Sequence, residues 1–340
     1  MSLKLLDCTL RDGGYVNDWN FGKENIIAII NGLVSANIDL IEVGFLNQNV
    51  LYDENKTILP EMKYFNSLLS NIDRKNTKLV AMIELGTFDI DRVPDKKDSL
   101  LDGIRVIFDY PKAKEGFAFC KKLKEKGYMV SANIIKITNC SEADLYDLFR
   151  IVNASPVDAI VIVDTYGHLD LDETQKIYKM FDENVSKNLI IGFHTHNTLQ
   201  LAVGNCLELI RVHNPKRIHF IDGTLNGMGK GAGNAYTEVL AKSLNKKEER
   251  YCLQRIADIL ENQLSEIKKQ YTWGFSLERY ISSISNVHYT YTKYFKDKKG
   301  MSYGDIIELE KLMKEETKHS FQEDVANETY KKYLKRKDNS

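Results

Sequence analysis

Two histidines, His194 and His196, stand one residue apart at the end of an apolar run, Leu189 to Phe193. Side chains two residues apart in a β-strand point to the same side, so both imidazoles can face one point beyond the carboxyl end of the strand. That arrangement suits a metal ion, although two histidines at a strand end can also hydrogen-bond to neighbouring carbonyl groups. A second motif favours the metal, because Arg11-Asp12-Gly13-Gly14 follows another short apolar run and adds a carboxylate.

Eight short apolar runs must position these groups. They alternate with segments of helical periodicity, and they are Lys4–Cys8, Leu40–Gly44, Lys78–Ile83, Gly103–Phe108, Met129–Ile134, Ala159–Val163, Leu189–Phe193 and Arg217–Ile221. Only the segment Thr87–Ser99 is weak as a helix. Continuously apolar strands that alternate with helices predict a parallel sheet with a covered outer face. Eight such units match a (β/α)8 TIM barrel, which takes about 250 residues; a doubly wound open sheet, which suits fewer strands, is the alternative.

Polar groups just after these strands are expected to meet at one site. In a closed barrel the first and last strands are neighbours, and active sites lie at the carboxyl ends, so Asp12, His194, His196 and Asn234 converge. One carboxylate, two imidazoles and an amide oxygen, with no thiolate, suit Mn²⁺ or Mg²⁺ better than a closed structural Zn²⁺ site. Co²⁺ and Zn²⁺ in an open site are alternatives.

The pattern changes after Leu244. A charged run at positions 245–250 is followed by helical sequence without a convincing strand, including an apolar stripe from Leu277 to Phe295. We therefore expect a catalytic barrel over residues 1–245 and a helical extension over residues 246–340 that covers the site or mediates assembly. The last residues, Lys331–Ser340, are polar and are expected to fray.

Composition excludes several classes of function. The 340 residues carry a net charge of -1 and are 43% hydrophobic, which is typical of a soluble globular protein and gives no electrostatic footprint for nucleic acid or a membrane surface. No apolar run approaches the roughly 20 residues of a membrane span. The five cysteines are scattered, which indicates free thiols in a reducing compartment, and the N-terminus lacks the pattern of a signal peptide, so we expect a cytoplasmic protein.

Five ordered motifs resemble one known family. They are Thr9-Leu10-Arg11-Asp12-Gly13, Glu42-Val43-Gly44-Phe45, Asp164-Thr165-Tyr166-Gly167, His194-Thr195-His196-Asn197 and Gly231-Ala232-Gly233-Asn234-Ala235. Together, over roughly residues 4–240, they resemble the divalent-metal TIM-barrel lyases and condensing enzymes, the family of HMG-CoA lyase. Within it the chain is most similar to the 4-hydroxy-2-oxovalerate aldolase branch, because the condensing branch usually has Gln where this chain has Tyr15.

The resemblance implies roles for the residues that match. Asp12, His194 and His196 would hold the metal, and Asn234 would lie in or beside its shell. Arg11 would bind substrate and stabilise the pyruvate enolate left when a carbon–carbon bond breaks.

Three further residues at the strand ends are candidates for contact with substrate, namely Glu42, Asp164 and Thr165. For Glu42 and Asp164 a structural role is the alternative. Glu42 could instead orient Arg11, and Asp164 could instead organise its own loop through backbone hydrogen bonds.

The general base departs from the family pattern. Aldolases of this branch have a histidine at the position of Tyr15, and a tyrosine with a pKa near 10 is a poor base at neutral pH. Tyr15 could orient the substrate hydroxyl group instead. Tyr280 and His288, both in the helical extension, are the alternatives for the catalytic proton transfer.

These observations predict a metal-dependent aldolase that cleaves or forms a 4-hydroxy-2-oxo acid from pyruvate and an aldehyde. A Claisen-type condensation of an acyl-CoA with a 2-oxo acid, as in isopropylmalate and homocitrate synthases, is the alternative. The expected partners are small molecules and a second copy of the chain in a homodimer. In the resembled aldolases the region after the barrel docks an aldehyde dehydrogenase; this chain diverges there.

Overall fold

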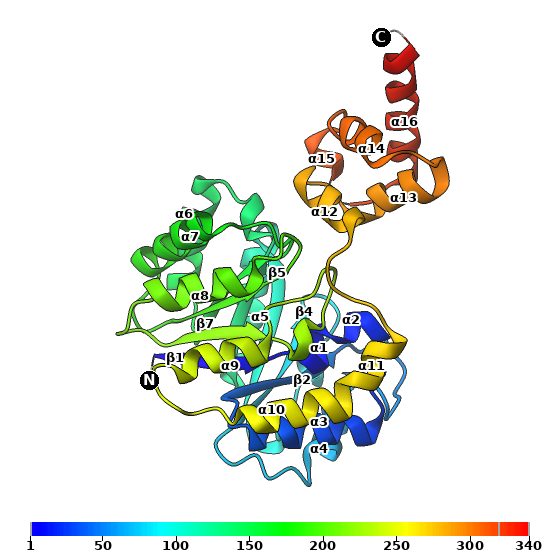
Figure 1. Ribbon diagram of the computed structural model, residues 1–340. Helices are drawn as coiled ribbons and strands as arrows, with labels where there is room; N and C mark the ends of the chain where they lie inside the picture. The colour runs from blue at the N-terminus through cyan, green and yellow to red at the C-terminus, as the bar shows by residue number, and fades with distance from the viewer. Residues whose placement is uncertain (1, 319, 339–340) are drawn as a thin grey trace.

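The chain folds as a closed parallel β-barrel with a helical tail. The computed structural model describes residues 2–318 and 320–338 (Figure 1). The eight barrel strands are β1 (Leu3–Asp7), β2 (Leu40–Leu46), β4 (Lys78–Glu84), β5 (Gly103–Asp109), β6 (Met129–Ile135), β7 (Ala159–Asp164), β8 (Ile190–Thr195) and β9 (His219–Gly223). Each strand pairs in parallel with the next, and β1 pairs with both β9 and β2, which closes the barrel. The predicted TIM barrel is confirmed.

Each predicted apolar run overlaps one of these strands, and the boundaries differ by at most two residues. An additional short strand, β3 (Ile58–Leu59), pairs with β2 outside the barrel and was not expected. The segment that was weak as a helix forms only two 3₁₀ turns, at Ile90–Arg92 and Lys96–Asp98.

Helices cover the outside of the barrel. They are α3 (Lys23–Ser35), α4 (Met62–Leu69), α5 (Ala113–Glu125), α6 (Glu142–Asn153), α7 (Leu171–Asn184), α8 (Ala202–Val212) and α9 (Thr237–Asn245). Local sequence fixes where such a helix begins, as α7 illustrates. The Asp170 carboxylate accepts a hydrogen bond from the amide of Glu173, and Glu173 accepts one from the amide of Asp170. Such a cap stabilises a helix by about 0.5–2 kcal/mol.

The helices directly after α9 still belong to the barrel. The helix α10 (Leu253–Ile259), a π-turn (Leu260–Leu264) and α11 (Ser265–Gln270) follow it. The helix α10 packs on α3 where Gly32 has no side chain, since a Cβ there would lie 2.5 Å from Cγ1 of Ile259. The buried residues of this segment join the barrel core up to Ile267, whereas a second hydrophobic cluster begins at Ile281. The change of core thus comes later than the expected change at residue 245, and the division into two domains stays a prediction.

The second cluster is formed by the tail helices. These are α12 (Leu277–Ile284), α13 (Tyr289–Lys299), α14 (Tyr303–Glu310), α15 (Glu315–Lys318) and α16 (Glu323–Asp338). They stand to one side of the barrel in Figure 1, after a linking segment at residues 271–276. The expected apolar stripe is broken between α12 and α13, because Asn286 adopts a left-handed conformation there with φ 52°.

The expectation that residues 331–340 fray is wrong for the residues described there. The helix α16 continues to Asp338, because Tyr330 and Tyr333 pack against the second cluster and the Tyr333 hydroxyl group hydrogen-bonds to Asp305. Residues 339–340 lie outside the described part of the chain.

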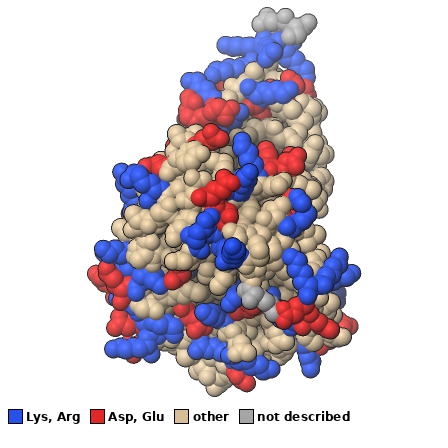
Figure 2. All heavy atoms as spheres, turned by 90° about the vertical axis from the view of Figure 1, so that its left-hand side faces the viewer, with Lys and Arg blue, Asp and Glu red and all other residues tan. Residues whose placement is uncertain are grey.

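Acidic and basic side chains are interspersed over the face seen in Figure 2, with basic residues gathered near the end of α16. Within residues 2–318 and 320–338, no helix combines the length and the apolar content that crossing a membrane requires.

Candidate functional site

Asp12, His194 and His196 converge at the carboxyl ends of β1 and β8. Their nitrogen and oxygen atoms lie within 4.8 Å of one another, and all three side chains are buried. The separation of 3.8 Å between His196 Nε2 and Asp12 Oδ2 is too long for a hydrogen bond. Two donors at that separation can both bind one ion at the usual bond lengths of about 2.0–2.2 Å.

A short helix, α1 (Thr9–Asp12), places the carboxylate in the barrel mouth directly after β1. Asp12 Oδ2 accepts hydrogen bonds from Asn234 Nδ2 at 2.5 Å and from the amide of Lys230 at 3.2 Å. A Cβ at position 229 would overlap both Asn234 Nδ2 and the Asp12 carboxylate, so the close approach of this loop requires Gly229. The structure thus brings all four predicted metal-site residues together.

Hydrogen bonds at Nδ1 orient the rings of both histidines and select one tautomer of the neutral imidazole. His194 Nδ1 donates to Asp222 Oδ2 at 3.1 Å, and His196 Nδ1 donates to the carbonyl oxygen of Asp164 at 3.0 Å. In a neutral imidazole the other nitrogen is then a lone-pair donor, as a metal ligand must be.

A buried network of alternating charges supports these donors. Asp12 Oδ1 accepts from Arg11 Nη1 at 2.6 Å, and Arg11 Nε donates to Glu42 Oε2 at 2.7 Å. Arg105 Nη1 donates to the same Glu42 oxygen at 3.0 Å, and its Nη2 donates to Asp222 Oδ2 at 2.5 Å. Asp222 in turn contacts His194, so the network connects one metal-site residue to another. Three carboxylates face two guanidinium groups, which leaves one negative charge for a cation to balance.

Electrostatics favours the protonation states that bind a metal. Burial alone would raise the pKa of Asp12, but Arg11 and the two imidazoles outweigh it and hold that pKa well below its ordinary value. Burial lowers the pKa of His196 to about 4, although Asp12 opposes the change. Arg105 likewise outweighs burial and lowers the pKa of Asp222. Near pH 7 the centre therefore offers ionised carboxylates and a neutral His196.

Two buried polar atoms test whether a cation fits. His196 Nε2 and Asn234 Oδ1 have no hydrogen-bond partner among the described residues. Burying an unsatisfied polar atom costs about 1–3 kcal/mol. Both atoms are lone-pair donors beside a carboxylate, and a divalent cation would satisfy both of them.

A second group, Cys8 with His194 and Asp222, also has donors within 4.8 Å of one another. It suits a metal less well, because Arg105 already pairs with Asp222 and burial raises the pKa of the Cys8 thiol well above its ordinary value. A protonated thiol is not a metal ligand.

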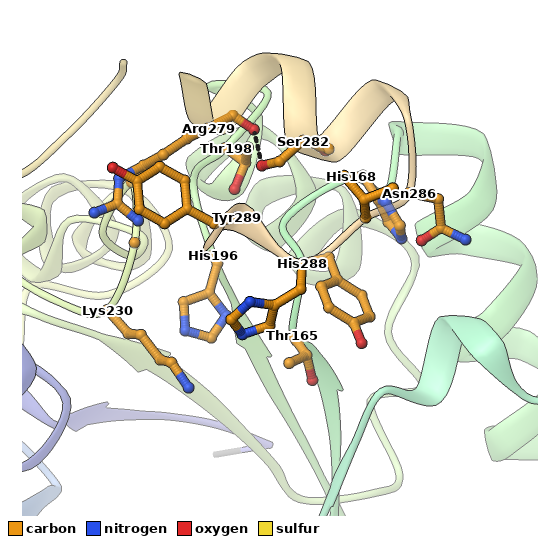
Figure 3. A pocket seen from close by; sticks show the side chains of 15 residues that line it. Thr165, His168, His196, Thr198, Lys230, Arg279, Ser282, Asn286, His288 and Tyr289 are labelled. Carbon is orange, nitrogen blue, oxygen red and sulfur yellow. Dashed lines mark hydrogen bonds between the residues drawn. The ribbon is translucent and has the colours of Figure 1, made fainter. Parts of the chain in front are cut away.

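A cavity of about 230 Å³ adjoins the centre at His196 and is lined on one side by the tail (Figure 3). Its barrel wall includes Thr165 and Lys230, and its tail wall comes from α12 and the start of α13. His196, His288 and Lys230 all line this cavity, and in Figure 3 the side chain of Lys230 extends below the ring of His196.

The tail places one of its two predicted catalytic residues at this cavity. His288, which precedes α13, lines it, and burial together with Lys230 and Lys136 lowers its pKa. Tyr280 is 37% exposed, contacts Phe275, and is not among the residues that line the cavity. The break between α12 and α13 turns His288 inward.

Tyr15 lies on α2 (Gly14–Asn17), beside the centre. Its ring packs edge-on against Trp19 with ring centroids 4.7 Å apart. Loss of hydration and the Asp12 carboxylate raise its pKa to about 12, so its hydroxyl group keeps its proton near pH 7 and can only donate or orient.

The three residues predicted to contact substrate differ in whether their side chains are already engaged by other residues. Asp164 is occupied by its own loop, because its oxygens accept from the amides of Gly167, His168 and Leu169. Burial raises its pKa to about 7. Glu42 is held by Arg11 and Arg105, as described above, whereas Thr165 lines the cavity.

Sequence reasoning did not find Arg105, which is 2% exposed in β5. The signal was a single charged residue inside the apolar run Gly103–Phe108, at a position that must point into the barrel. Lys230 and Arg279 at the cavity were also missed, because the path of the tail across the barrel is not encoded in a local motif.

A family model and two related enzymes match this chain in sequence. The HMGL-like family model matches residues 108–266, a range that contains His194, His196 and Asn234. An oxaloacetate decarboxylase of Mycobacterium tuberculosis is 27% identical over 245 residues, covering 72% of this chain and 70% of the relative. A 4-hydroxy-2-oxovalerate aldolase of Geobacillus genomosp. 3 is 26% identical over 258 residues, covering 72% and 71%. The family resemblance expected from the motifs is confirmed.

Solved structures agree in fold. The N-terminal domain of a Bacteroides vulgatus protein described as a candidate aldolase superposes with a TM-score of 0.74 at 25% identity, over 90% of this chain and 99% of that one. An HMG-CoA lyase of Bacillus subtilis superposes with a TM-score of 0.60 at 15% identity, over 78% and 93%, and shows the fold alone. The names of these relatives support an enzyme of the lyase class.

Proposed function

We propose that this chain, which resembles HMGL-like proteins in sequence and in fold, is a divalent-metal-dependent carbon–carbon lyase. It would cleave a 4-hydroxy-2-oxo acid to pyruvate and an aldehyde, or form the acid from them. The observation that carries the proposal is the buried set of Asp12, His194 and His196, with the unsatisfied atoms of His196 and Asn234 beside it. The relatives named as 4-hydroxy-2-oxovalerate aldolases support the same class of reaction.

Asp12, His194 and His196 would hold the ion, with Asn234 in or beside the shell, and their oxygen and nitrogen donors favour Mn²⁺ or Mg²⁺. Bound there, the ion would supply Lewis acidity to the keto oxygen of a 2-oxo acid.

Arg11 is positioned to bind that substrate and to stabilise negative charge. Its Nε and Nη1 atoms are held by Glu42 and Asp12, and no described residue accepts a hydrogen bond from Nη2. The guanidinium group is therefore fixed in orientation and still has N–H groups to donate. As the bond between C3 and C4 breaks, charge develops on the former keto oxygen, and a preorganised donor there stabilises the transition state.

His288 is the better candidate for the base that takes the proton of the 4-hydroxyl group. Its lowered pKa makes the imidazole neutral near pH 7, and its ring lines the same cavity as His196. Its Nδ1 accepts a hydrogen bond of 3.4 Å from the amide of Thr290, so a proton taken up at that nitrogen would have to displace this long contact. Tyr15, with its raised pKa, instead donates a hydrogen bond to substrate or water.

In this proposal Asp164 and Glu42 do not contact the substrate but position residues that do. Asp164 holds the loop that carries Thr165, and Glu42 holds Arg11. Thr165 Oγ1 accepts a hydrogen bond from the amide of Lys136 at 2.6 Å and donates only a long one, of 3.5 Å, to the carbonyl oxygen of Val163. A ligand in the cavity can replace that long hydrogen bond.

The direct test is the release of pyruvate from 4-hydroxy-2-oxovalerate by Mn²⁺-loaded protein, followed through coupled oxidation of NADH by lactate dehydrogenase. We expect turnover that is lost after chelation and restored by Mn²⁺. Release of thiol from acetyl-CoA with a 2-oxo acid, without any pyruvate from 4-hydroxy-2-oxo acids, would refute the proposal in favour of a condensing enzyme.

The similarity to an oxaloacetate decarboxylase favours a second candidate reaction. Decarboxylation of oxaloacetate also leaves the enolate of pyruvate, so the same residues would serve it. Comparing kcat/KM for oxaloacetate with that for 4-hydroxy-2-oxovalerate distinguishes the two reactions.

Assembly as a homodimer and a location in the cytoplasm are also part of this proposal, as is a site-covering role for the tail. Light scattering of the full chain tests the dimer. Co-purification with an aldehyde dehydrogenase would test whether the tail docks one.

A further inference from the structure

The cavity between the barrel and the tail has an unusual charge composition, and the inference drawn from it rests on the proposed lyase function. Its lining residues include two cationic side chains, Lys230 and Arg279, and no aspartate or glutamate. A concave site with one sign of charge attracts ligands of the opposite sign.

Lys230 carries the positive charge on the barrel side. Its amide donates to Asp12 Oδ2 at 3.2 Å, so its side chain starts beside the metal donors. Its Nζ lies 5.0 Å from the centroid of the Tyr15 ring, and no described carboxylate forms an ion pair with it. The amino group thus lies near both the metal donors and the cavity.

Arg279 carries the positive charge on the tail side. Its guanidinium carbon lies 4.4 Å from the centroid of the Tyr289 ring, and its Nη1 lies 3.3 Å from the place that a Cβ on Gly231 would occupy. The tail cation therefore sits directly against the loop that follows Lys230. Burial lowers the pKa of Arg279, and the nearby Glu278 is held by the hydroxyl group of Tyr303. No described carboxylate forms an ion pair with Arg279.

Ser283 adds an independent observation. It lines the cavity, is only 9% exposed, and its hydroxyl oxygen has no hydrogen-bond partner among the described residues. Burying a hydroxyl group without a hydrogen-bond partner destabilises the protein, and a ligand that forms the missing hydrogen bond removes that cost.

We propose that this cavity binds a second anionic group of the substrate, so that the aldehyde released or consumed carries a carboxylate or a phosphate. The 2-oxo acid end would lie at Asp12, His194 and His196, and the far anionic end would lie between Lys230, Arg279 and Ser283. The volume of about 230 Å³ is below the roughly 300–1,000 Å³ of sites for drug-sized ligands, which fits a short-chain aldehyde.

The test is the addition of pyruvate to two matched pairs of aldehydes, measured as kcat/KM with Mn²⁺-loaded protein. Butyraldehyde and succinic semialdehyde have the same chain length and differ in the terminal carboxylate. Glyceraldehyde and glyceraldehyde 3-phosphate differ in the phosphate. We expect at least one anionic aldehyde to exceed its neutral partner by tenfold or more, and the pair that shows the difference identifies the anion.

Arg279→Gln should lower kcat/KM for that anionic aldehyde by about 10–100-fold, the usual effect of losing a charge-assisted hydrogen bond, and affect its neutral partner much less. Arg279→Lys should restore part of the preference. Ser283→Ala provides a second test with a smaller expected loss, because it deletes only one hydroxyl group. Arg255→Gln, at an exposed arginine on α10 paired with Asp258, is the control and should leave the preference unchanged.

The outcomes separate this inference from the proposed function. If neutral and anionic aldehydes react equally well, or if the preference survives both Arg279→Gln and Ser283→Ala, the anion site is refuted while the lyase stands. If pyruvate is neither consumed nor released with any of these compounds, the proposed function fails and this inference fails with it.

Discussion

Replacing Arg105 by methionine should break the buried charge network at its centre. Arg105 is 2% exposed and donates to Glu42 at 3.0 Å and to Asp222 at 2.5 Å. Methionine is unbranched and uncharged and can replace only the aliphatic part of the side chain, so Arg105→Met leaves two buried carboxylates without their shared partner. Their remaining partners are Arg11 on Glu42 and His194 on Asp222.

The expected loss of stability is large. Removing one member of a buried ion pair costs about 3–5 kcal/mol, a substantial fraction of the roughly 5–15 kcal/mol that stabilises a typical domain. The loss should also depend on pH. In the native protein Arg105 holds the pKa of Asp222 low, so this pair stabilises the fold above the unfolded pKa and loses that effect as the pH falls. In the variant Asp222 has lost the guanidinium group that holds its pKa low, so the difference between the two proteins is larger at pH 8 than at pH 5.

Urea denaturation at the two pH values measures the free energy of unfolding directly. Activity should also fall, by about 10–100-fold, because Asp222 and Glu42 orient His194 and Arg11. Arg150→Met removes an exposed arginine that pairs with Asp147 and is the matched control, with an expected change below about 1 kcal/mol. If Arg105→Met is no more destabilising than this control at pH 8, the buried network does not have the role assigned to it.

Three further changes test other parts of the account. Arg11→Ala should lower kcat by about 10²–10³ while bound manganese, measured by atomic emission, stays at the native level; loss of the metal together with activity would make Arg11 a structural residue. His288→Gln should lower kcat by a factor of about 10²–10⁴. It should also remove the rise of activity with pH on the acid side, where the native imidazole loses its proton. An unchanged pH profile would exclude His288 as the base. Burial raises the pKa of Glu310 to about 7, so its ionisation weakens the fold as the pH rises through that value. Glu310→Gln should therefore stabilise the tail at pH 8 by up to about 3 kcal/mol and have little effect near pH 4.5. Equal melting curves of the two proteins at pH 8 would contradict this.

The barrel and the centre of the site could be predicted because both depend on local sequence. Each barrel strand is a mainly apolar run, and most of the site residues follow the carboxyl end of such a run. The spacing of His194, near the end of β8, and His196, directly after that strand, predicts that both side chains face the same side. The closure of β1 against β9 then brings Asp12 and Asn234 to them from distant parts of the sequence.

The rest depends on contacts that local sequence does not specify. Arg105 is a polar side chain inside an apolar strand, and only the barrel interior shows that Glu42 and Asp222 neutralise it. The position of His288 at the cavity, where Tyr280 is absent, depends on the break between α12 and α13 near Asn286. The extent of the barrel core to Ile267 likewise follows from the packing of α10 on α3.

The most direct test is a crystal structure of the protein with Mn²⁺ and oxalate, with the metal located by anomalous diffraction. The account predicts one strong anomalous peak in contact with the side chains of Asp12, His194 and His196, with oxalate beside Arg11. A peak at Cys8 and Asp222 instead, or no peak between Asp12 and the two imidazoles, would contradict it.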